Sequence, residues 1–178
     1  RQVLEVDDEA DQWEVDIEEE CLKILALHQP VAVDLRFIIA VLKINNDLER
    51  IGDEAVNIAE RSLRVSPLPL PGEPVDFAPL CRLVQEALRA ALDALVRLDA
   101  PLAHKVRHSD DAIDEMVHDL FVRLKEEIKR HPDQTDQLIE YLRVSRHLER
   151  IADHATNIAE DVIYMIEGSI VRHRHEAI

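Results

Sequence analysis

Four pairs of carboxylates, each spaced four residues apart, are the groups in this sequence best suited to bind a ligand. They are Asp7 with Asp11, Glu49 with Asp53, Asp110 with Asp114, and Glu149 with Asp153. Residues four apart lie on one face of an α-helix, so each pair would present its oxygens side by side. Such oxygens suit a hard cation such as Mg²⁺, Mn²⁺, Ca²⁺ or oxidised iron. Asn57 and Asn157, one turn beyond two of the pairs, would add further oxygen ligands.

An internal repeat distinguishes these pairs from the chance pairs of an acidic chain. With 37 acidic residues among 178, carboxylates four apart are common, and most charged helix faces are simply solvated. However, LERIGDEAVNIAE at 48–60 recurs as LERIADHATNIAE at 148–160, with ten of thirteen positions identical. Shared packing needs only the apolar positions, yet the acids recur too, while Glu54 is replaced by His154. The recurrence therefore favours a metal site over a solvated face.

The repeat extends upstream with a different offset. The stretch 6–20 aligns with 109–123 and pairs Asp7 with Asp110 and Asp11 with Asp114. The offset there is 103 residues rather than 100, so the turn around HQPVAVDLR carries three extra residues. Insertions are best tolerated in loops, which supports a turn at this point.

Helical spacing of apolar residues places the carboxylates on long helices. Apolar residues recur every three or four positions on both sides of a proline-rich stretch, SPLPLPGEPV. The pattern predicts five helices, at 1–28, 31–65, 76–99, 101–130 and 133–167, with Gly168 ending the last.

The predicted fold is all-α, a tandem repeat of two three-helix bundles. The first repeat spans 1–65, the proline-rich linker 66–75, and the second repeat 76–178. The first bundle is expected to lack its N-terminal helix, because the counterpart of 76–99 would precede residue 1.

The direction of the acids follows from helix geometry. If Leu48 marks the centre of the buried stripe, Glu49 and Asp53 lie at about 100° and 140° from it, on the outer face. Asp110 and Asp114 fall on a flank of their helix, from which they could approach the acids of the next helix. One surface metal site in each repeat is therefore predicted.

The bulk composition excludes several classes of function. A formal charge of −16 disfavours nucleic acid and unaided binding to an anionic membrane. The longest apolar stretch, 35–42, is too short to span a bilayer, so no direct membrane insertion is expected. Cys21 and Cys81 form no CxxC motif, and a cytoplasmic location is predicted. Apolar surface on an incomplete bundle predicts a homo-oligomer, such as a homodimer.

The stretch QPVAVDLRFIIAVLKINNDLERIGDEAVNIAER at 29–61, echoed by YLRVSRHLERIADHATNIAE at 141–160, resembles the PhoU family of regulators linked to bacterial phosphate uptake. The resemblance covers essentially the whole chain. It implies metal ions, single or in multinuclear clusters, held by repeated Glu/Asp-x-x-x-Asp motifs, with iron, manganese, magnesium and zinc as candidates. The implied metal ligands are Asp7, Asp11, Glu49, Asp53, Asn57, Asp110, Asp114, Glu149, Asp153 and Asn157.

The same resemblance implies a protein without enzymatic activity. It would be a negative regulator of the phosphate-starvation response, a cytoplasmic adaptor between the phosphate ABC transporter and a sensor histidine kinase. A relative serving a low-affinity phosphate permease would share the fold, and that alternative stays open.

Two further alternatives concern the acids. They could form a metal-free contact face that steers a partner protein. A di-iron carboxylate enzyme would instead need inward-facing Glu-x-x-His motifs on two helices. The chain offers one such pair, Glu115 with His118, and the repeat counterparts Gln12 and Val15 do not match it.

Overall fold

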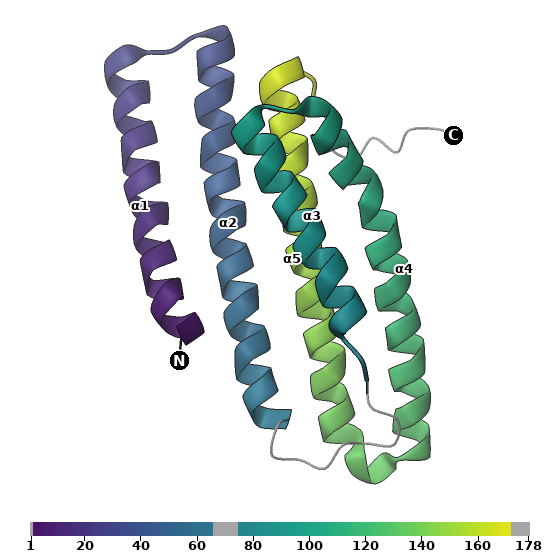
Figure 1. Ribbon diagram of the computed structural model, residues 1–178. Helices are drawn as coiled ribbons and strands as arrows, with labels where there is room; N and C mark the ends of the chain where they lie inside the picture. Colours follow the sequence, from purple (N-terminus) through teal and green to yellow (C-terminus); the bar gives the residue numbers. More distant parts are fainter. Residues whose placement is uncertain (1, 66–74, 172–178) are drawn as a thin grey trace.

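Five α-helices and one short 3₁₀ helix form the computed structural model, which describes the backbone of residues 2–65 and 75–171 and side chains from residue 9 onward. They are α1 (Gln2–His28), α2 (Ala32–Val65), α3 (Ala78–Arg97), α4 (Ala100–Arg130), η1 (Pro132–Gln134) and α5 (Thr135–Glu167) (Figure 1). These residues contain no strand, so the all-α prediction is confirmed. Each α-helix begins and ends within two residues of the predicted position.

Across the molecule α1 lies beside α2, and α2 lies beside the bundle of α3, α4 and α5, in which α3 passes in front of α5 in the view of Figure 1. The three helices α3, α4 and α5 pack against one another, as the three-helix prediction for the second repeat requires. α2 packs against α5, and α1 contacts only α2 among the described helices. The first repeat therefore adds two successive layers to a closed bundle.

The core lies along α5, which is covered by α2, α3 and α4. Ile158 and Val162 of α5 are fully buried. Facing them are small side chains, including Ala40 of α2 and Ala91 and Ala94 of α3, each with no exposed surface. Small residues let the helix backbones approach closely, so three helices can pack around a single central one.

Two helix ends follow from local sequence. Asp99 precedes α4, and its side chain accepts a hydrogen bond from the Leu102 N–H at 2.9 Å, which satisfies a free donor of the first turn. Gly168 ends α5, as predicted, with a φ of 72°. Its N–H donates to the Tyr164 carbonyl. A side chain at Gly168 would also meet the guanidinium of Arg36, whose Cζ is 3.3 Å from the position of a Cβ.

Leu48 is not the centre of the buried stripe of α2, and this part of the prediction is wrong. Its side chain is 37% exposed, whereas the equivalent Leu148 is 6% exposed. Leu148 packs in a cluster with Leu80 and Val84 of α3. No described helix covers Leu48 in the same way, and α2 instead turns the face bearing Ile44 toward α5.

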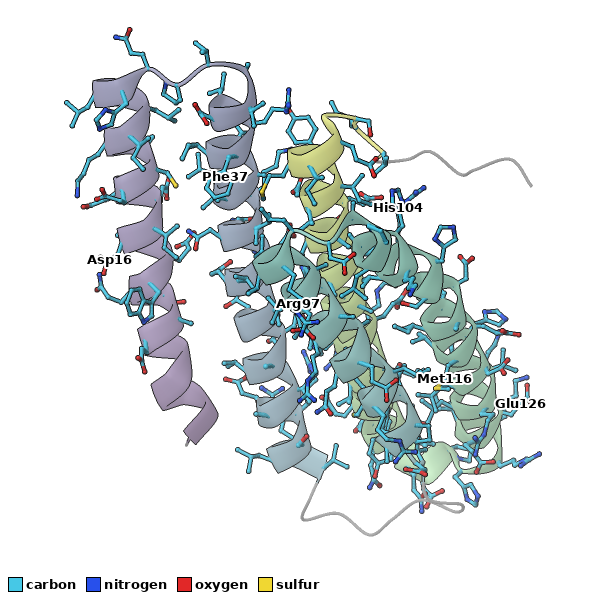
Figure 2. The ribbon with its side chains drawn as sticks, turned by 45° about the horizontal axis from the view of Figure 1, so that its top comes forward. Asp16, Phe37, Arg97, His104, Met116 and Glu126 are labelled. Atoms are coloured by element: carbon cyan, nitrogen blue, oxygen red, sulfur yellow. The ribbon has the colours of Figure 1, made fainter. Side chains whose placement is uncertain are left out.

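The exposed surface of α1 carries acids together with large apolar side chains, among them Trp13, Leu22 and Leu27. Figure 2 shows Asp16 on this surface, directed away from the rest of the molecule. Among the helices that the structure describes, none has an apolar stretch that could cross a membrane.

Candidate functional site

Four of the predicted acids lie near enough to one another, on α4 and α5, for their charges to interact. We call them the second acidic cluster: Asp110 and Asp114 of α4 with Glu149 and Asp153 of α5. Thr156 donates a hydrogen bond from its hydroxyl to Asp110 Oδ1 at 3.1 Å, which holds this carboxylate toward α5. This contact agrees with the prediction that the acids of α4 approach the following helix, α5.

The carboxylates of the second acidic cluster repel one another, and this repulsion contributes to raised pKa values. Burial raises the pKa of Asp110, Asp114 and Asp153, and neighbouring carboxylates raise each of them further. Glu149 contributes to all three rises. The charged form of the cluster is therefore destabilised, which is the condition that a bound cation relieves.

A first acidic cluster lies between α1 and α2. It comprises Asp11 and Glu14 of α1 with Glu49 and Asp53 of α2. Burial raises the pKa of Glu49 most, and the charge of Asp53 raises it further. Arg50 opposes this rise, and Glu14 and Asp11 of α1 add smaller increases. Glu49 Oε2 is buried and has no hydrogen-bond partner.

A contact between α1 and α2 positions the first acidic cluster. Asn45 of α2 donates from Nδ2 to the backbone carbonyl of Glu14 at 2.8 Å, next to the acids. Glu14 was not predicted as part of the site, because its repeat counterpart is the apolar Val117. Its only sequence signal is its place one turn beyond Asp11.

The helical projection predicted that the acids lie on outward faces. Asp11, Asp114 and Asp153 are exposed, as predicted, whereas Glu49 and Glu149 are partly buried. The side chains of Glu49 and Glu149 are only 21% and 19% exposed. α2 packs against both α5 and α1, and the charges of Glu14 and Asp11 on α1 act on Glu49, which places Glu49 on the side of α2 that meets α1. Glu49 therefore lies at a helix–helix boundary.

The other predicted ligands differ in position. Asp7 belongs to α1, but its side chain lies outside the described residues. Asn57 is half-buried on α2. Asn157 donates from Nδ2 to Asp47 of α2 at 3.2 Å, so its amide is engaged across the contact with α2.

The donor chemistry of both clusters fits a hard cation. All the described acids offer carboxylate oxygens, and Glu49 Oε2 is a buried acceptor without a donor. No three His, Cys, Asp or Glu side chains in the described part of the chain are placed to hold one ion. The clusters thus supply ligands and concentrated negative charge without a closed coordination shell.

Sequence reasoning missed a line of buried polar contacts between α2 and α5, which we call the inter-repeat seam. Asp47 Oδ1 of α2 lies 2.8 Å from His154 Nδ1 of α5. Glu54 of α2 pairs with Arg150 Nη1 at 2.7 Å and with His147 Nδ1 at 2.5 Å. Asp47 and Glu54 are 6% and 3% exposed, so both carboxylates are almost fully buried between the repeats.

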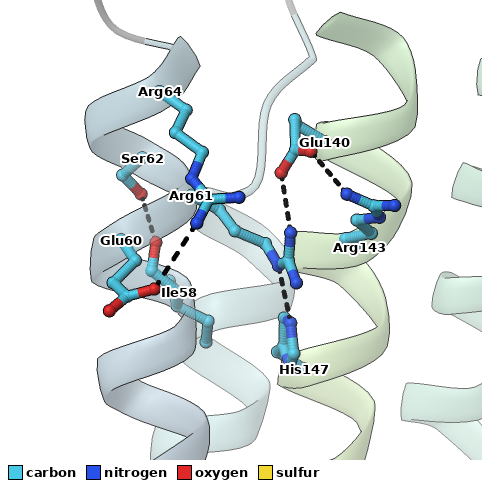
Figure 3. Close-up of polar contacts among 8 residues, drawn as sticks. All are labelled: Ile58, Glu60, Arg61, Ser62, Arg64, Glu140, Arg143 and His147. Atoms are coloured by element: carbon cyan, nitrogen blue, oxygen red, sulfur yellow. Dashed lines mark hydrogen bonds and ion pairs between the residues drawn. The ribbon is translucent and has the colours of Figure 1, made fainter. Parts of the chain in front are cut away.

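The inter-repeat seam continues toward the end of α2 (Figure 3). Arg61 donates from Nε to His147 Nε2 at 2.9 Å, and its Nη1 lies 2.9 Å from Glu140. Because an arginine Nε–H only donates, His147 Nε2 is the acceptor and Nδ1 carries the proton donated to Glu54. The tautomer of His147 is thereby fixed by its two partners on α2.

The inter-repeat seam forms where equivalent positions of the two repeats carry residues of opposite character, an acid in one and histidine in the other. Positions 47 and 147 are equivalent, as are 54 and 154. In each pair the first repeat has an acid and the second has histidine, and the antiparallel helices bring acid 47 to histidine 154 and acid 54 to histidine 147. The replacement of Glu54 by His154 was the feature of the sequence that could have indicated this seam, because it reflects pairing of acids with histidines between the repeats.

The residues of the di-iron alternative face the wrong way for that chemistry. Such a site requires Glu and His side chains that project into the bundle interior. Glu115 and His118 are both exposed on α4.

Comparisons with known proteins agree with the architecture. A family model described as the PhoU domain matches residues 1–62 and 77–162. The phosphate-specific transport system accessory protein PhoU homolog of Pseudomonas aeruginosa is 41% identical over 174 residues, covering 97% of this chain and 72% of the relative.

Solved structures agree as well. The crystal structure of PhoU from Pseudomonas aeruginosa matches with a TM-score of 0.91 at 40% identity, covering 94% of this chain and 81% of that one. The phosphate transport system regulatory protein PhoU from Streptococcus pneumoniae matches with a TM-score of 0.81 at 30% identity, covering 96% and 80% of the two chains. Together, the family model and these relatives show that the chain belongs to the PhoU domain family.

Proposed function

We propose that this chain is an accessory regulatory protein of phosphate transport, an adaptor that conveys the state of the phosphate ABC transporter to a sensor histidine kinase. The observation that carries the proposal is its 41% identity, along nearly its whole length, to a relative named an accessory protein of the phosphate-specific transport system. A structural match named as a regulatory protein of the same system supports the regulatory part. The chain would act by binding and would repress the phosphate-starvation genes.

The adaptor role is tested in a host whose own gene for the protein has been deleted. Expression of the protein should restore repression of a phosphate-starvation reporter at high phosphate. Affinity capture of the tagged protein should also recover the transporter ATPase and the sensor kinase. If the protein restores no repression and neither partner is recovered, the adaptor proposal is wrong. Recovery of a low-affinity permease instead would favour the alternative partner.

We further propose that the two acidic clusters hold metal ions as part of this function. The proposal is supported by carboxylates from two helices in each cluster, by their mutual repulsion and by the buried Glu49 Oε2, which accepts no hydrogen bond and has only the Arg50 guanidinium near it at 3.4 Å. A bound ion would neutralise the acids and join α1 to α2 and α4 to α5. The residues that would hold it are Asp11, Glu14, Glu49, Asp53, Asp110, Asp114, Glu149 and Asp153.

Thermal unfolding of chelator-treated protein tests the metal proposal. Mn²⁺ at about one hundred times its dissociation constant stabilises a single-site protein by about 2.7 kcal/mol, so the melting temperature should rise. The rise should disappear in the variant Glu49→Gln, Asp53→Asn, Glu149→Gln, Asp153→Asn. Equal responses of the two proteins would contradict the proposal and favour a metal-free contact face, whose partner binding weakens with salt and is insensitive to chelators.

A further inference from the structure

One side of the α1–α2 pair carries large apolar side chains that are exposed in the structure. Trp13 of α1 is 60% exposed, and Phe37 and Leu48 of α2 are 45% and 37% exposed. Phe37 precedes Leu48 by about three helical turns, so both side chains lie on the same side of α2. Grouped apolar side chains of this kind mark interaction surfaces, whereas isolated ones are ordinary.

The second repeat shows what the same side of a helix pair accommodates. The counterpart of Trp13 is Met116 of α4, which packs against the core of that repeat. The counterpart of Leu48 is Leu148 of α5, which belongs to the same cluster. Leu80 of α3 is buried there as well. In the second repeat, one amphipathic helix therefore covers the side that the first repeat leaves exposed.

The pairs α1–α2 and α4–α5 share one register, so the comparison applies to the exposed side. Burial is the main cause of the raised pKa of Glu49 on α2, and the charge of Asp11 on α1 adds to it. Burial likewise raises the pKa of Asp114 on α4, and the charge of Glu149 on α5 adds to it. These positions are equivalent in the repeat. The exposed side of α1 and α2 can therefore accept one helix in the place that α3 takes in the second repeat.

The borders of this exposed side are acidic. Glu9 and Asp16 lie four residues before and three residues after Trp13, so they are its neighbours on the surface of α1. Asp34 lies three residues before Phe37 and is its neighbour on α2. All three acids are exposed. No residue three or four positions from any of the exposed apolar side chains named above is lysine or arginine.

This acidity is specific to the first repeat. α1 contains ten acidic residues and one lysine, whereas its counterpart α4 contains seven acidic residues and six lysines or arginines. A second copy of this chain would place an equally acidic side against the first, which is unfavourable. An apolar side with acidic borders is instead complementary to a helix that has an apolar stripe and basic borders.

We propose that the exposed side formed by Trp13, Phe37 and Leu48, which we call the open face, binds a basic amphipathic helix of a partner protein. The partner helix lies where α3 lies in the second repeat, with its apolar stripe on the open face and its lysines or arginines beside the bordering acids. This inference rests on the proposed adaptor function, for which it supplies the chemistry of one partner. It does not depend on metal binding by the acidic clusters.

Fluorescence of Trp13, the only tryptophan of the sequence, reports directly on the open face. The probes are three synthetic peptides without tryptophan, each 20 residues long like α3. The first combines the Leu, Val and Ala stripe of α3 with lysine on both borders, the second has glutamate on the borders, and the third is a scrambled form of the first. The first peptide should shift the Trp13 emission to shorter wavelength and bind at least about tenfold more tightly than the others. Its affinity should fall as salt is added.

The test variant is Leu48→Lys, and Leu35→Lys is the matched control. Leu35 lies on the same helix and is 40% exposed, but it points about 140° away from Leu48 around the helix axis. Leu48→Lys should weaken binding of the first peptide more than about tenfold, because it replaces a central apolar contact by a positive charge. Leu35→Lys should change it less than about twofold. Equal effects of the two changes, with unchanged helix content by circular dichroism, would overturn the inference.

Other occupants of the open face give different results. A dimer by light scattering that Leu48→Lys dissociates would assign the open face to a second copy. Trp13 emission typical of a buried indole, unchanged by every peptide, would assign it to another part of the same polypeptide. Either result overturns the inference. If no peptide binds while the protein still restores repression in the deletion host, the open face fails as a docking site and the adaptor function stands.

Discussion

The two repeats carry equivalent acids on unequal scaffolds. Leu148 of α5 is 6% exposed beneath α3, whereas Leu48 of α2 is 37% exposed. Met116 of α4 packs against the core of the second repeat, while its counterpart on α1, Trp13, is 60% exposed. The second acidic cluster thus lies on a closed three-helix bundle, and the first on a pair of helices attached through α2.

The two repeats contain identical leucines and identical glutamates, and the structure shows that only the glutamates have similar surroundings in both. Leu48 and Leu148 are identical although their packing differs, so identity there does not report equal burial. Glu49 and Glu149 are also identical, and both lie at a boundary between two helices within a group of acids. What the two described clusters share is one aspartate, Asp11 or Asp114, beside the Glu-x-x-x-Asp pair of the following helix, whereas the surrounding core is specific to each repeat.

The largest expected effect comes from truncating the equivalent leucines. Leu148→Ala should lower the free energy of unfolding by about 2–5 kcal/mol, because it opens a cavity in the packed core. Leu48→Ala should cost less than about 1 kcal/mol, because the side chain is partly solvated. Urea denaturation monitored by circular dichroism measures both. Equal losses would show that the packing of the two repeats does not differ as described.

A smaller effect is expected at the inter-repeat seam. His154→Glu gives the second repeat the residue of the first and places a carboxylate against buried Asp47, which should cost about 1–3 kcal/mol of stability. Adding Asp47→His reverses the pair and should restore most of the loss. His118→Glu, the same change at an exposed position of α4, is the control and should have little effect. Failure of the double variant to recover stability would argue against complementary pairing.

The smallest effect concerns the repulsion in the second acidic cluster. A carboxyl group whose pKa is higher in the folded state stabilises the fold below its unfolded pKa and loses that contribution as the pH rises through the folded value. Burial and neighbouring acids raise the pKa of Asp110 in this way. With chelator present, Asp110→Asn should therefore be more stable than wild type at pH 7, by less than about 1 kcal/mol.

The difference between Asp110→Asn and wild type should vanish near pH 4, around the unfolded pKa of aspartate. Denaturation of both proteins across this pH range measures it. A variant less stable than wild type at neutral pH would show that the hydrogen bond from Thr156 outweighs the repulsion.

The sequence was sufficient to predict the five helices and their limits, since apolar spacing, the proline-rich stretch and Gly168 act locally. It also identified the acids through the repeat. It failed to predict which face of α2 is buried, because Leu48 has the type and spacing of a core residue. In the structure α3 covers the equivalent Leu148, and no described helix covers Leu48 in that way. Glu14 and Thr156 escaped the repeat comparison because their counterparts, Val117 and Val56, differ in chemistry.

The measurement that tests the central claim most directly is elemental analysis of protein purified without chelator and without a metal-affinity column. It should be compared with the variant in which Glu49, Asp53, Glu149 and Asp153 are all changed to Ala. Metal ions bound to the wild type and lost from the variant, with unchanged helix content, would show that the repeated acids form metal sites. The absence of metal above background in the wild type would contradict that claim and assign the acids to solvent or to a protein partner.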